Sequence, residues 1–277
     1  MTFAGRTAVI SGGSRGIGLQ IAAALGARGA NIVLLAKTAE PNPKLPGTIH
    51  TAVAEIQRSG AEAVAVCGDV RNADDVERAV ETAVGHFGGV DICINNASAL
   101  DISGTADLPL KKFDLMIDVN IRGTFALTKA CLPHLKQSPS AHILTLSPPI
   151  NLRPKWLGAH PAYTLSKYGM TTLALGFAEE LRPFQIASNC LWPETTIATA
   201  AVNNILGGQQ TVKRSRQPTI MAAAACLILQ TPPTQLSGQC LIDAAVLADA
   251  GVTDLSPYGG EPPLQLDIFV DPTGPVR

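Results

Sequence analysis

The chain has 277 residues, of which 46% are hydrophobic and 16% are charged, with a formal net charge of -1. This composition predicts a large buried core, and the near-zero charge excludes an electrostatic basis for binding nucleic acid or an anionic membrane. No apolar run reaches the roughly 20 residues that span a bilayer, and the six cysteines stand singly, without metal-ligand or disulfide spacing. We therefore expect a cytoplasmic protein that binds no metal, nucleic acid or membrane.

Short apolar segments alternate with longer amphipathic segments along the sequence. Residues 7–10 are predicted to form a strand, and a helix is predicted from about 16 to 28. The further strands are predicted at 31–36, 63–67, 91–94, 142–146, 186–191 and 239–242, and the further helices at 48–58, 73–87, 108–136, 161–181 and 217–229. Apolar strands without alternation are typical of a sheet buried on both faces. The order predicts an α/β fold with a single Rossmann-type parallel sheet of about seven strands, flanked by helices.

Two proline-rich segments interrupt this alternation. Residues 39–47 and residues 147–160 carry three prolines each and are predicted to be loops. No repeat or linker divides the chain, so we expect one domain over 1–250. The remaining segment, 251–277, is rich in proline and glycine and is expected to pack on the surface or against a neighbouring subunit.

The first strand leads directly into a glycine-rich segment, Ser-Gly-Gly-Ser-Arg-Gly-Ile-Gly at residues 11–18, which opens the first helix. Glycines at such a turn let the backbone approach a pyrophosphate, whose charge is favoured at the helix N-terminus. A simple tight turn is the alternative, but the strand–turn–helix context favours dinucleotide binding.

The end of the second strand indicates which dinucleotide is bound. An NAD-binding domain usually offers a carboxylate there to the adenosine ribose, whereas this chain has Lys37 followed by Thr38. Lys37 and Arg15 would attract a 2′-phosphate, so the sequence favours NADP(H) over NAD(H). The alternative is that both cations are solvated on surface turns.

Tyr163 and Lys167 are four residues apart in a predicted helix, so both side chains are expected on one helix face. A lysine ammonium beside a phenol stabilises the phenolate, so that a weak acid with a pKa of roughly 10 becomes a usable proton donor and acceptor. The same spacing also occurs by chance between solvated residues on a surface helix.

Together these motifs resemble the short-chain dehydrogenase/reductase family over residues 5–245. The resemblance rests on the glycine loop, Asp69 after the third strand, Asn-Asn-Ala-Ser at 95–98, Asn120, and the Tyr163/Lys167 pair, in that order. More narrowly, segments 36–41, 147–149 and 191–193 resemble the hydroxysteroid dehydrogenase-like protein 2 branch. Animal members of that branch add a sterol-carrier domain, and none is expected in this sequence.

The resemblance implies roles for individual residues. Tyr163 would exchange a proton with the substrate oxygen, and Lys167 would lower the tyrosine pKa and bind the nicotinamide ribose. Asn120 would hold a water beside Lys167, with a helix-interior amide bonded to backbone as the alternative. The implied cofactor-binding residues are Ser11, Gly12, Ser14, Arg15, Gly16, Ile17, Gly18, Lys37, Asp69, Val70, Asn95, Ala97, Tyr163, Lys167 and Pro193.

The chain also departs from the family pattern. Ser98 and Glu194 stand where the family has glycine, and Pro148 stands where it has the serine that polarises the substrate carbonyl. Ser147 is the nearest hydroxyl and our candidate for that role; otherwise carbonyl polarisation rests on Tyr163 alone.

The sequence therefore predicts an NADP(H)-dependent oxidoreductase acting on an alcohol/carbonyl pair. The apolar loops around the expected cleft favour a hydrophobic small molecule such as a lipid, terpenoid or sterol-like alcohol. The alternative is an NADP(H)-binding protein with little or no turnover. By analogy with the family, a homodimer or homotetramer is expected.

Overall fold

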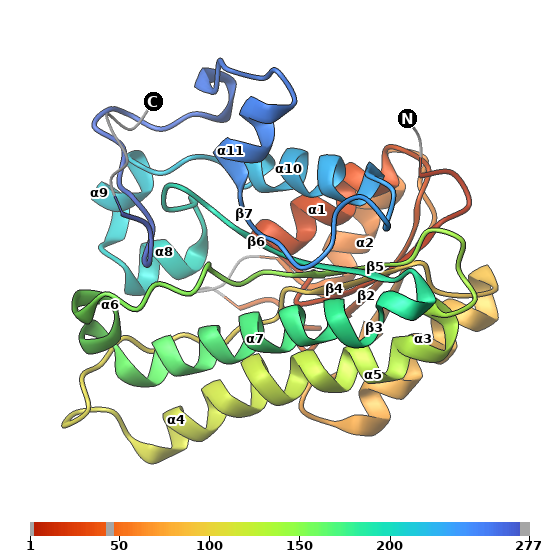
Figure 1. The fold of residues 1–277 in the computed structure, drawn as a ribbon, viewed down its shortest axis with the longest axis horizontal. Coiled ribbons are helices and arrows are strands. Elements are labelled where there is room, and N and C mark those ends of the chain that lie inside the picture. Colours follow the sequence, from red (N-terminus) through yellow and green to blue (C-terminus); the bar gives the residue numbers. More distant parts are fainter. Residues whose placement is uncertain (1–2, 43–46, 272–277) are drawn as a thin grey trace.

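A computed structural model describes residues 3–42 and 47–271, which form one seven-stranded parallel sheet with helices on both faces (Figure 1). The strands are β1 (Thr7–Ser11), β2 (Asn31–Ala36), β3 (Ala63–Cys67), β4 (Ile92–Asn95), β5 (His142–Thr145), β6 (Ala187–Trp192) and β7 (Cys240–Ile242). Their order is β3-β2-β1-β4-β5-β6-β7, and each neighbouring pair is parallel. The predicted Rossmann-type fold is confirmed.

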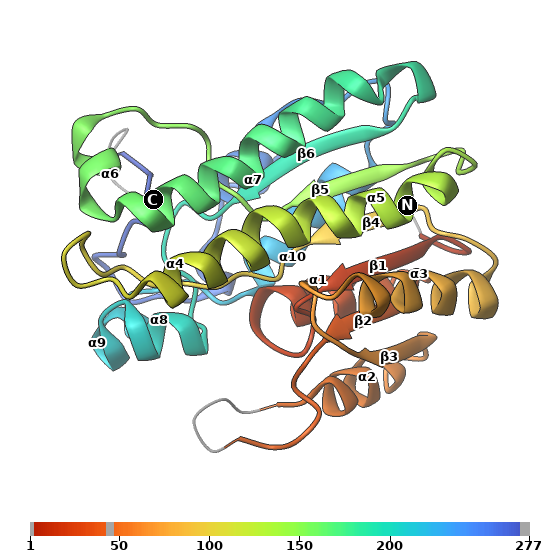
Figure 2. The ribbon, with the colours of Figure 1, turned by 90° about the horizontal axis from the view of Figure 1, so that it is seen from below.

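The strands are apolar on both faces because both faces are covered. On β1, Ala8 and Ile10 belong to one core and Val9 to the other. The first core lies under α1 (Gly16–Gly26), α2 (Ile49–Gln57), α10 (Thr219–Gln230) and α11 (Asp243–Asp249). The second lies under α3 (Ala73–Phe87), α5 (Gly123–Leu135) and α7 (Pro161–Glu180), which Figure 2 shows side by side. Alternate strand residues thus hold two helical layers onto one sheet.

The helix predicted over 108–136 is present with a change of winding. It consists of α4 (Leu110–Met116), a π-helical segment (Ile117–Arg122) and α5. Such wide turns are rare and frequently occur at functional sites. Hydrophobic periodicity cannot detect them, because the segment remains helical on either side.

Several short helices were not predicted from the sequence. They are α6 (Pro154–Ala159), within the loop predicted at 147–160, α8 (Ala200–Ile205), α9 (Gly208–Lys213) and α11. Each has six or seven residues, too few for a clear amphipathic repeat. The loop predicted at 39–47 includes residues 43–46, which lie outside the described residues.

The end of the described chain returns to the carboxyl edge of the sheet. Leu266 forms an antiparallel bridge with Thr195, just beyond β6, and Thr196 donates its N–H to the Gln265 carbonyl at 2.8 Å. The segment then runs beside α6 and the start of α7 (Figure 2). Phe269 packs there in a third apolar cluster with Tyr163 and Trp192.

Leu34→Ala should destabilise the fold by about 2–5 kcal/mol, because the Leu34 side chain is fully buried and its removal leaves a cavity. Leu34 also supports the glycine loop, since a Cβ on Gly13 would lie 2.5 Å from Leu34 Cδ2. Urea unfolding followed by circular dichroism measures the change. The control is Leu110→Ala, because the Leu110 side chain is 79% exposed, and it should change stability by less than about 0.5 kcal/mol. Equal losses of stability in the two variants would contradict the assignment of Leu34 to the buried core.

Candidate active site

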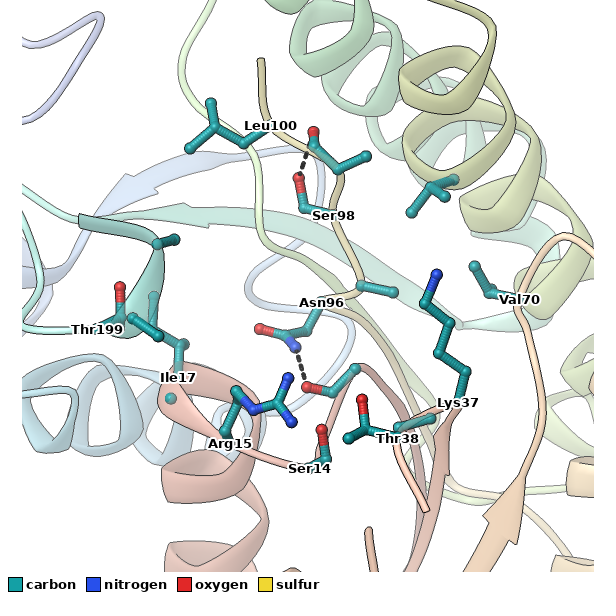
Figure 3. A pocket seen from close by; sticks show the side chains of 18 of the residues that line it. Ser14, Arg15, Ile17, Lys37, Thr38, Val70, Asn96, Ser98, Leu100 and Thr199 are labelled. Carbon is teal, nitrogen blue, oxygen red and sulfur yellow. Dashed lines mark hydrogen bonds between the residues drawn. The ribbon is translucent and has the colours of Figure 1, made fainter. Parts of the chain in front are cut away.

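A cleft of about 940 Å³ opens at the carboxyl ends of the central strands (Figure 3). It lies where β1 pairs with β4, so the chain leaves these neighbouring strands toward opposite sides. This is the topological switch point at which parallel α/β sheets bind their ligands. The loop after β1 supplies Gly12, Ser14, Arg15, Gly16 and Ile17 to the cleft wall, and all five are among the residues assigned from the sequence to cofactor binding.

The glycine loop leaves space for a bound group beside a helix N-terminus. Gly12 and Gly16 have φ angles of +71° and +58°, which favour glycine. A Cβ on Gly12 would lie 2.8 Å from the Ala97 Cα, whereas one on Gly16 would meet only Thr199, at 3.4 Å. The Arg15 side chain makes no capping bond to the first turn of α1. The backbone N–H groups of that first turn therefore remain available to an anion. The loop therefore fits the pyrophosphate of a dinucleotide.

Ser11 joins the glycine loop to the chain leaving β4. Its Oγ accepts the N–H groups of Asn96 at 3.2 Å and Ala97 at 3.1 Å, and donates to the Ile94 carbonyl. The Asn96 amide donates in turn to the carbonyls of Ser11 and Gly12, both at 3.0 Å. Ser11 is buried, so it holds the loops together and does not line the cleft.

Of the two neighbouring asparagines, Asn96 lines the cleft and Asn95 does not. Asn95 is buried and donates its amide to Thr128 at 3.0 Å and Thr145 at 3.4 Å. Successive residues of a strand point to opposite sides, so only one of the pair can face the cleft. Asn95 was predicted from the sequence to line the cofactor cleft, whereas in the structure Asn96 lines it.

Charged side chains mark the other end of the cleft, around the exit of β2. Lys37 is 67% exposed and its Nζ lies 4.0 Å from Asp69, whose carboxylate also pairs with Arg71 at 2.8 Å. The hydrogen bond from Arg71 lowers the pKa of Asp69. Arg15 donates to the Gly47 carbonyl at 2.7 Å, and Figure 3 shows Arg15 and Lys37 on the same side of the pocket. Val70 lines the cleft beside them.

The loop after β6 and helix α8 close the cleft from a third side, with Ala198 and Thr199 of the loop and Asn204 of α8 in its wall. Pro193, which was predicted from the sequence to bind the cofactor, is buried at the end of β6 and lies outside this wall. Gly18 likewise packs behind the loop, against Asn96. The small and polar composition of residues 198–204 carried no distinctive signal.

The Tyr163/Lys167 pair lies on the buried face of α7. Tyr163 is 6% exposed and Lys167 is 2% exposed. The Lys167 ammonium donates to the Leu146 carbonyl at 2.6 Å, just after β5, and lies 5.0 Å from the centroid of the Trp192 ring. Burial lowers the pKa of Lys167 to about 7 and raises the pKa of Tyr163 above its ordinary value, with the Asp267 carboxyl adding to the second effect.

Tyr163 belongs to a cluster of aromatic side chains centred on Phe269. Phe269, from the end of the described chain, is stacked on Tyr163 with ring centroids 6.2 Å apart and an interplanar angle of 21°. Phe269 also contacts Trp156, Tyr168 and Trp192, with centroids 5.1 to 6.2 Å away. Sequence reasoning missed Phe269, because nothing in the pattern of 251–277 connects it with Tyr163.

Asn120 lies in the π-helical segment and is fully buried. Its amide accepts the Ala99 N–H at 2.7 Å and donates to the Ala99 carbonyl at 3.0 Å and to Ser166 Oγ at 2.9 Å. Ser166 precedes Lys167 on α7. Asn120 thus ties the loop after β4 to the helix that carries the pair, which is the backbone-bonding alternative considered for it.

Ser147 is also fully buried, and its Oγ has no hydrogen-bond partner among the described residues. It is not part of the cleft wall. The next residue, Pro148, accepts a hydrogen bond from Thr171 at 2.7 Å through its carbonyl and has no side-chain donor of its own. The hydroxyl that the sequence analysis selected therefore lies away from the cleft.

Comparison with known proteins identifies the class that this fold and cleft define. Residues 6–209 match the family model described as short chain dehydrogenase. The chain belongs to this family, whose members bind a nicotinamide cofactor and act as oxidoreductases.

Its relatives agree with the narrower resemblance. Over 97% of this chain, hydroxysteroid dehydrogenase-like protein 2 of Danio rerio is 50% identical, and that of Homo sapiens is 48% identical. The chain spans 64% of the length of each of these relatives. A short chain dehydrogenase from Mycobacterium thermoresistibile is 51% identical, with a TM-score of 0.93 and 99% of both chains covered.

More distant structures share the fold with different cofactors. A metagenomic short-chain oxidoreductase in complex with NADP has 26% identity and a TM-score of 0.71, over 87% of this chain and 98% of its own. Carveol dehydrogenase from Mycobacterium avium, in complex with NAD, has 22% identity and a TM-score of 0.75, over 86% and 96%. Among residues 3–42 and 47–271, no helix is both long and apolar enough to cross a membrane.

Gly18→Ala should weaken the binding of reduced nicotinamide dinucleotide by at least roughly tenfold. The added Cβ would lie 2.4 Å from Asn96 Nδ2 and 2.8 Å from the Gly12 carbonyl, so it would displace the bonds that shape the glycine loop. Quenching of tryptophan fluorescence measures the affinity. Gly176→Ala, on α7 with no atom within 4 Å of the new Cβ, is the matched control and should bind like the wild type.

Proposed function

We propose that the protein is an NADP(H)-dependent oxidoreductase that transfers hydride between nicotinamide and an alcohol/carbonyl group of a hydrophobic small molecule. The observation that carries this proposal is the position of Tyr163 and Lys167. Both are buried on one face of α7 at the carboxyl edge of the sheet, where Lys167 bonds to the chain leaving β5. Neither side chain is part of the cleft wall, but Tyr163 packs in one apolar cluster with Leu100 and Met116, which are, so the acid–base pair lies beside the dinucleotide cleft.

Cofactor binding and proton transfer are assigned to different residues. The backbone N–H groups at the start of α1, with Ser14 and Arg15, hold the dinucleotide phosphates. When bound, the cofactor supplies or accepts the hydride. In the reducing direction the Tyr163 phenol donates its proton to the substrate oxygen, and the Lys167 ammonium stabilises the phenolate that remains.

Loss of charge at Lys167 would remove this stabilisation, because only the ammonium favours the phenolate. Burial holds the pKa of Lys167 at about 7, so the free amine is already common near neutral pH before ligands bind. A bound substrate whose oxygen gains negative charge would favour the ammonium. Ser147 is fully buried and is not part of the cleft wall, so we assign carbonyl polarisation to Tyr163 among the proposed catalytic residues.

The preference for NADP(H) is supported by the charges at the exit of β2. Lys37 stands where NAD-binding domains usually carry a carboxylate, and its side chain is 67% exposed at the cleft. Arg15 lies on the same side of the pocket (Figure 3). Asp69, the nearest carboxylate, is paired with Arg71 and Lys37.

A hydrophobic substrate is supported by the apolar side chains near Tyr163. Leu100, Leu115 and Met116 line the cleft, and Trp156 and Trp192 lie in the aromatic cluster. Ile150 and Leu152, 44% and 69% accessible, add two exposed apolar side chains on the loop before α6. We propose that residues 1–250 form the dinucleotide-binding and catalytic domain, with the end of the described chain packed against it through Phe269, and we expect a homodimer or homotetramer, as is usual in the family.

The second candidate function is NADP(H) binding with little or no turnover. It is favoured by the stacking of Phe269 on Tyr163 and by the burial of Ser147 outside the cleft wall. The two functions predict the same cofactor affinity and differ only in turnover.

Tyr163→Phe should abolish turnover, with a loss of at least about 100-fold in kcat, while cofactor affinity stays within twofold. The assay follows absorbance at 340 nm with medium-chain and terpenoid aldehydes, ketones and alcohols. Tight NADPH binding by the wild type with no turnover across the panel would favour the binding protein.

Lys37→Asp should weaken NADPH binding roughly tenfold or more and NADH binding much less, because a carboxylate repels the 2′-phosphate. Lys111→Asp reverses an exposed charge outside the cleft and should leave both affinities unchanged. Equal losses for both cofactors in Lys37→Asp would refute the NADP assignment.

A further inference from the structure

The last described residues of the chain, 265–271, form a strap at the carboxyl edge of the sheet. Near its start, Leu266 forms an antiparallel bridge with Thr195. The Trp192 indole N–H then donates to the Ile268 carbonyl at 2.9 Å. Figure 2 shows the strap continuing beside α6 and the start of α7. Its first half is thus held by the end of β6 and by the chain that leaves this strand.

Phe269 lies in the second half of the strap, where it stacks on Tyr163 with ring centroids 6.2 Å apart. Phe269 is buried although its φ is +74°, a value that bulky residues rarely adopt. Tyr163 is buried as well, whereas Leu100 and Met116, which belong to the same apolar cluster, line the cleft. A substrate that comes from the cleft to Tyr163 therefore has to contact this cluster and the Phe269 ring within it.

The far end of the strap is held by the carboxylate of Asp271. One carboxylate oxygen accepts the Asn151 amide N–H at 2.7 Å and pairs with Arg153 at 3.2 Å. The other oxygen pairs with Lys155 and accepts the Trp156 indole N–H at 3.3 Å. The hydrogen bonds from Lys155 and Asn151 lower the pKa of Asp271 to about 2, so the carboxylate is charged at neutral pH. These four contacts form a latch between the strap and the start of α6.

The latch is exposed to solvent, in contrast to the bonds that hold the start of the strap. The side chains of Arg153 and Lys155 are 65% and 52% exposed, so water and salt screen their ion pairs. The latch also reaches Phe269, because the Asn151 amide donates both to Asp271 and to the Phe269 carbonyl, the latter at 3.2 Å. Loss of the Asp271 charge would therefore loosen Phe269 while the start of the strap stays bound.

We propose that Phe269 is a specificity-determining residue, which limits the access of bulky substrates to Tyr163, and that Asp271 positions it there. This role rests on the proposed oxidoreductase function and deepens it, since it assigns the apolar part of the substrate to the place of the Phe269 ring. Four aromatic residues bound that place, with ring centroids 5.1 to 6.2 Å from that of Phe269: Trp156, Tyr163, Tyr168 and Trp192. A cyclic hydrophobic carbonyl compound that displaces Phe269 regains its contacts with these rings.

The first test compares kcat/KM for the bicyclic ketone decalone with kcat/KM for butanal, with NADPH as the reductant. Phe269→Ala should raise the ratio of the two at least roughly tenfold, mainly through a lower KM for decalone, because this substrate no longer has to displace the ring. Phe269→Leu should give an intermediate ratio, and it replaces Phe269→Ala if that variant does not fold. The matched control is Phe184→Ala, at a phenylalanine 48% exposed, which should keep the wild-type ratio. An unchanged ratio in the Phe269 variants would overturn the role of Phe269.

The second test separates positioning by Asp271 from a general structural role. Asp271→Asn should shift the substrate ratio in the same direction as Phe269→Ala, and Asp271→Glu should restore the wild-type ratio. If Asp271 acts through Phe269, the double variant should have the ratio of Phe269→Ala alone. Independent effects that multiply in the double variant would overturn the positioning role.

A third readout needs no turnover, because the two tryptophans of the chain both lie in the cluster around Phe269. Quenching of their fluorescence by acrylamide, without cofactor, should increase about twofold in Asp271→Asn as the strap loosens. In the wild type about 1 M sodium chloride should have the same effect, because salt screens the latch. Asp254→Asn, at an exposed carboxylate earlier in the C-terminal segment, should leave quenching unchanged. Equal quenching in Asp271→Asn and the wild type, at low and high salt, would refute the latch.

The outcomes distinguish this role from the proposed function itself. Turnover that Tyr163→Phe abolishes, combined with an unchanged substrate ratio in the Phe269 variants, refutes only the role of Phe269. Absence of turnover with every carbonyl compound, in the wild type and in Phe269→Ala, refutes the oxidoreductase and with it the specificity role.

Discussion

The parallel pairing of β1 with β4 is the constraint on which the rest of the molecule depends. It brings the glycine loop and the Asn96 loop, 85 positions apart, to one edge of the sheet, and Ser11 then fastens them through four hydrogen bonds of 3.0 to 3.3 Å with Asn96, Ala97 and Ile94. The backbone N–H groups of α1 can face a common cleft only because these loops are held. Glycine at 12 and 18 is required by the same closeness, since a Cβ at either position would collide with the Asn96–Ala97 loop.

A second constraint acts on Tyr163 and Lys167, which are both buried. Burial disfavours charge on Lys167, Tyr163 and Asp267 alike, and their pKa values shift accordingly: that of lysine downward and those of the two acids upward. An acid–base centre of this kind is sensitive to which segment covers it, and here that segment is the end of the described chain.

The helix packing around this centre links it to the cleft. Asn120, in the π-helical segment, bonds both to Ala99 in the loop after β4 and to Ser166 beside Lys167. In a regular α-helix the Asn120 side chain would point in a different direction. The contacts of its amide therefore depend on the π-helical segment. The fold thereby couples the position of the cleft wall to that of α7 through a single side chain.

The amino-acid sequence by itself determined the order of the strands and helices, the parallel sheet, the glycine loop and the spacing of Tyr163 and Lys167, because these depend on local periodicity and on residues close together in the chain. It also indicated the short-chain dehydrogenase family before any geometry was known. Tertiary structure alone decided that Asn96 lines the cleft in place of Asn95, that Ser147 is buried outside the cleft wall, and that Phe269 stacks on Tyr163. Each of these outcomes depends on contacts between segments far apart in sequence, for which neither strand alternation nor motif spacing carries a signal.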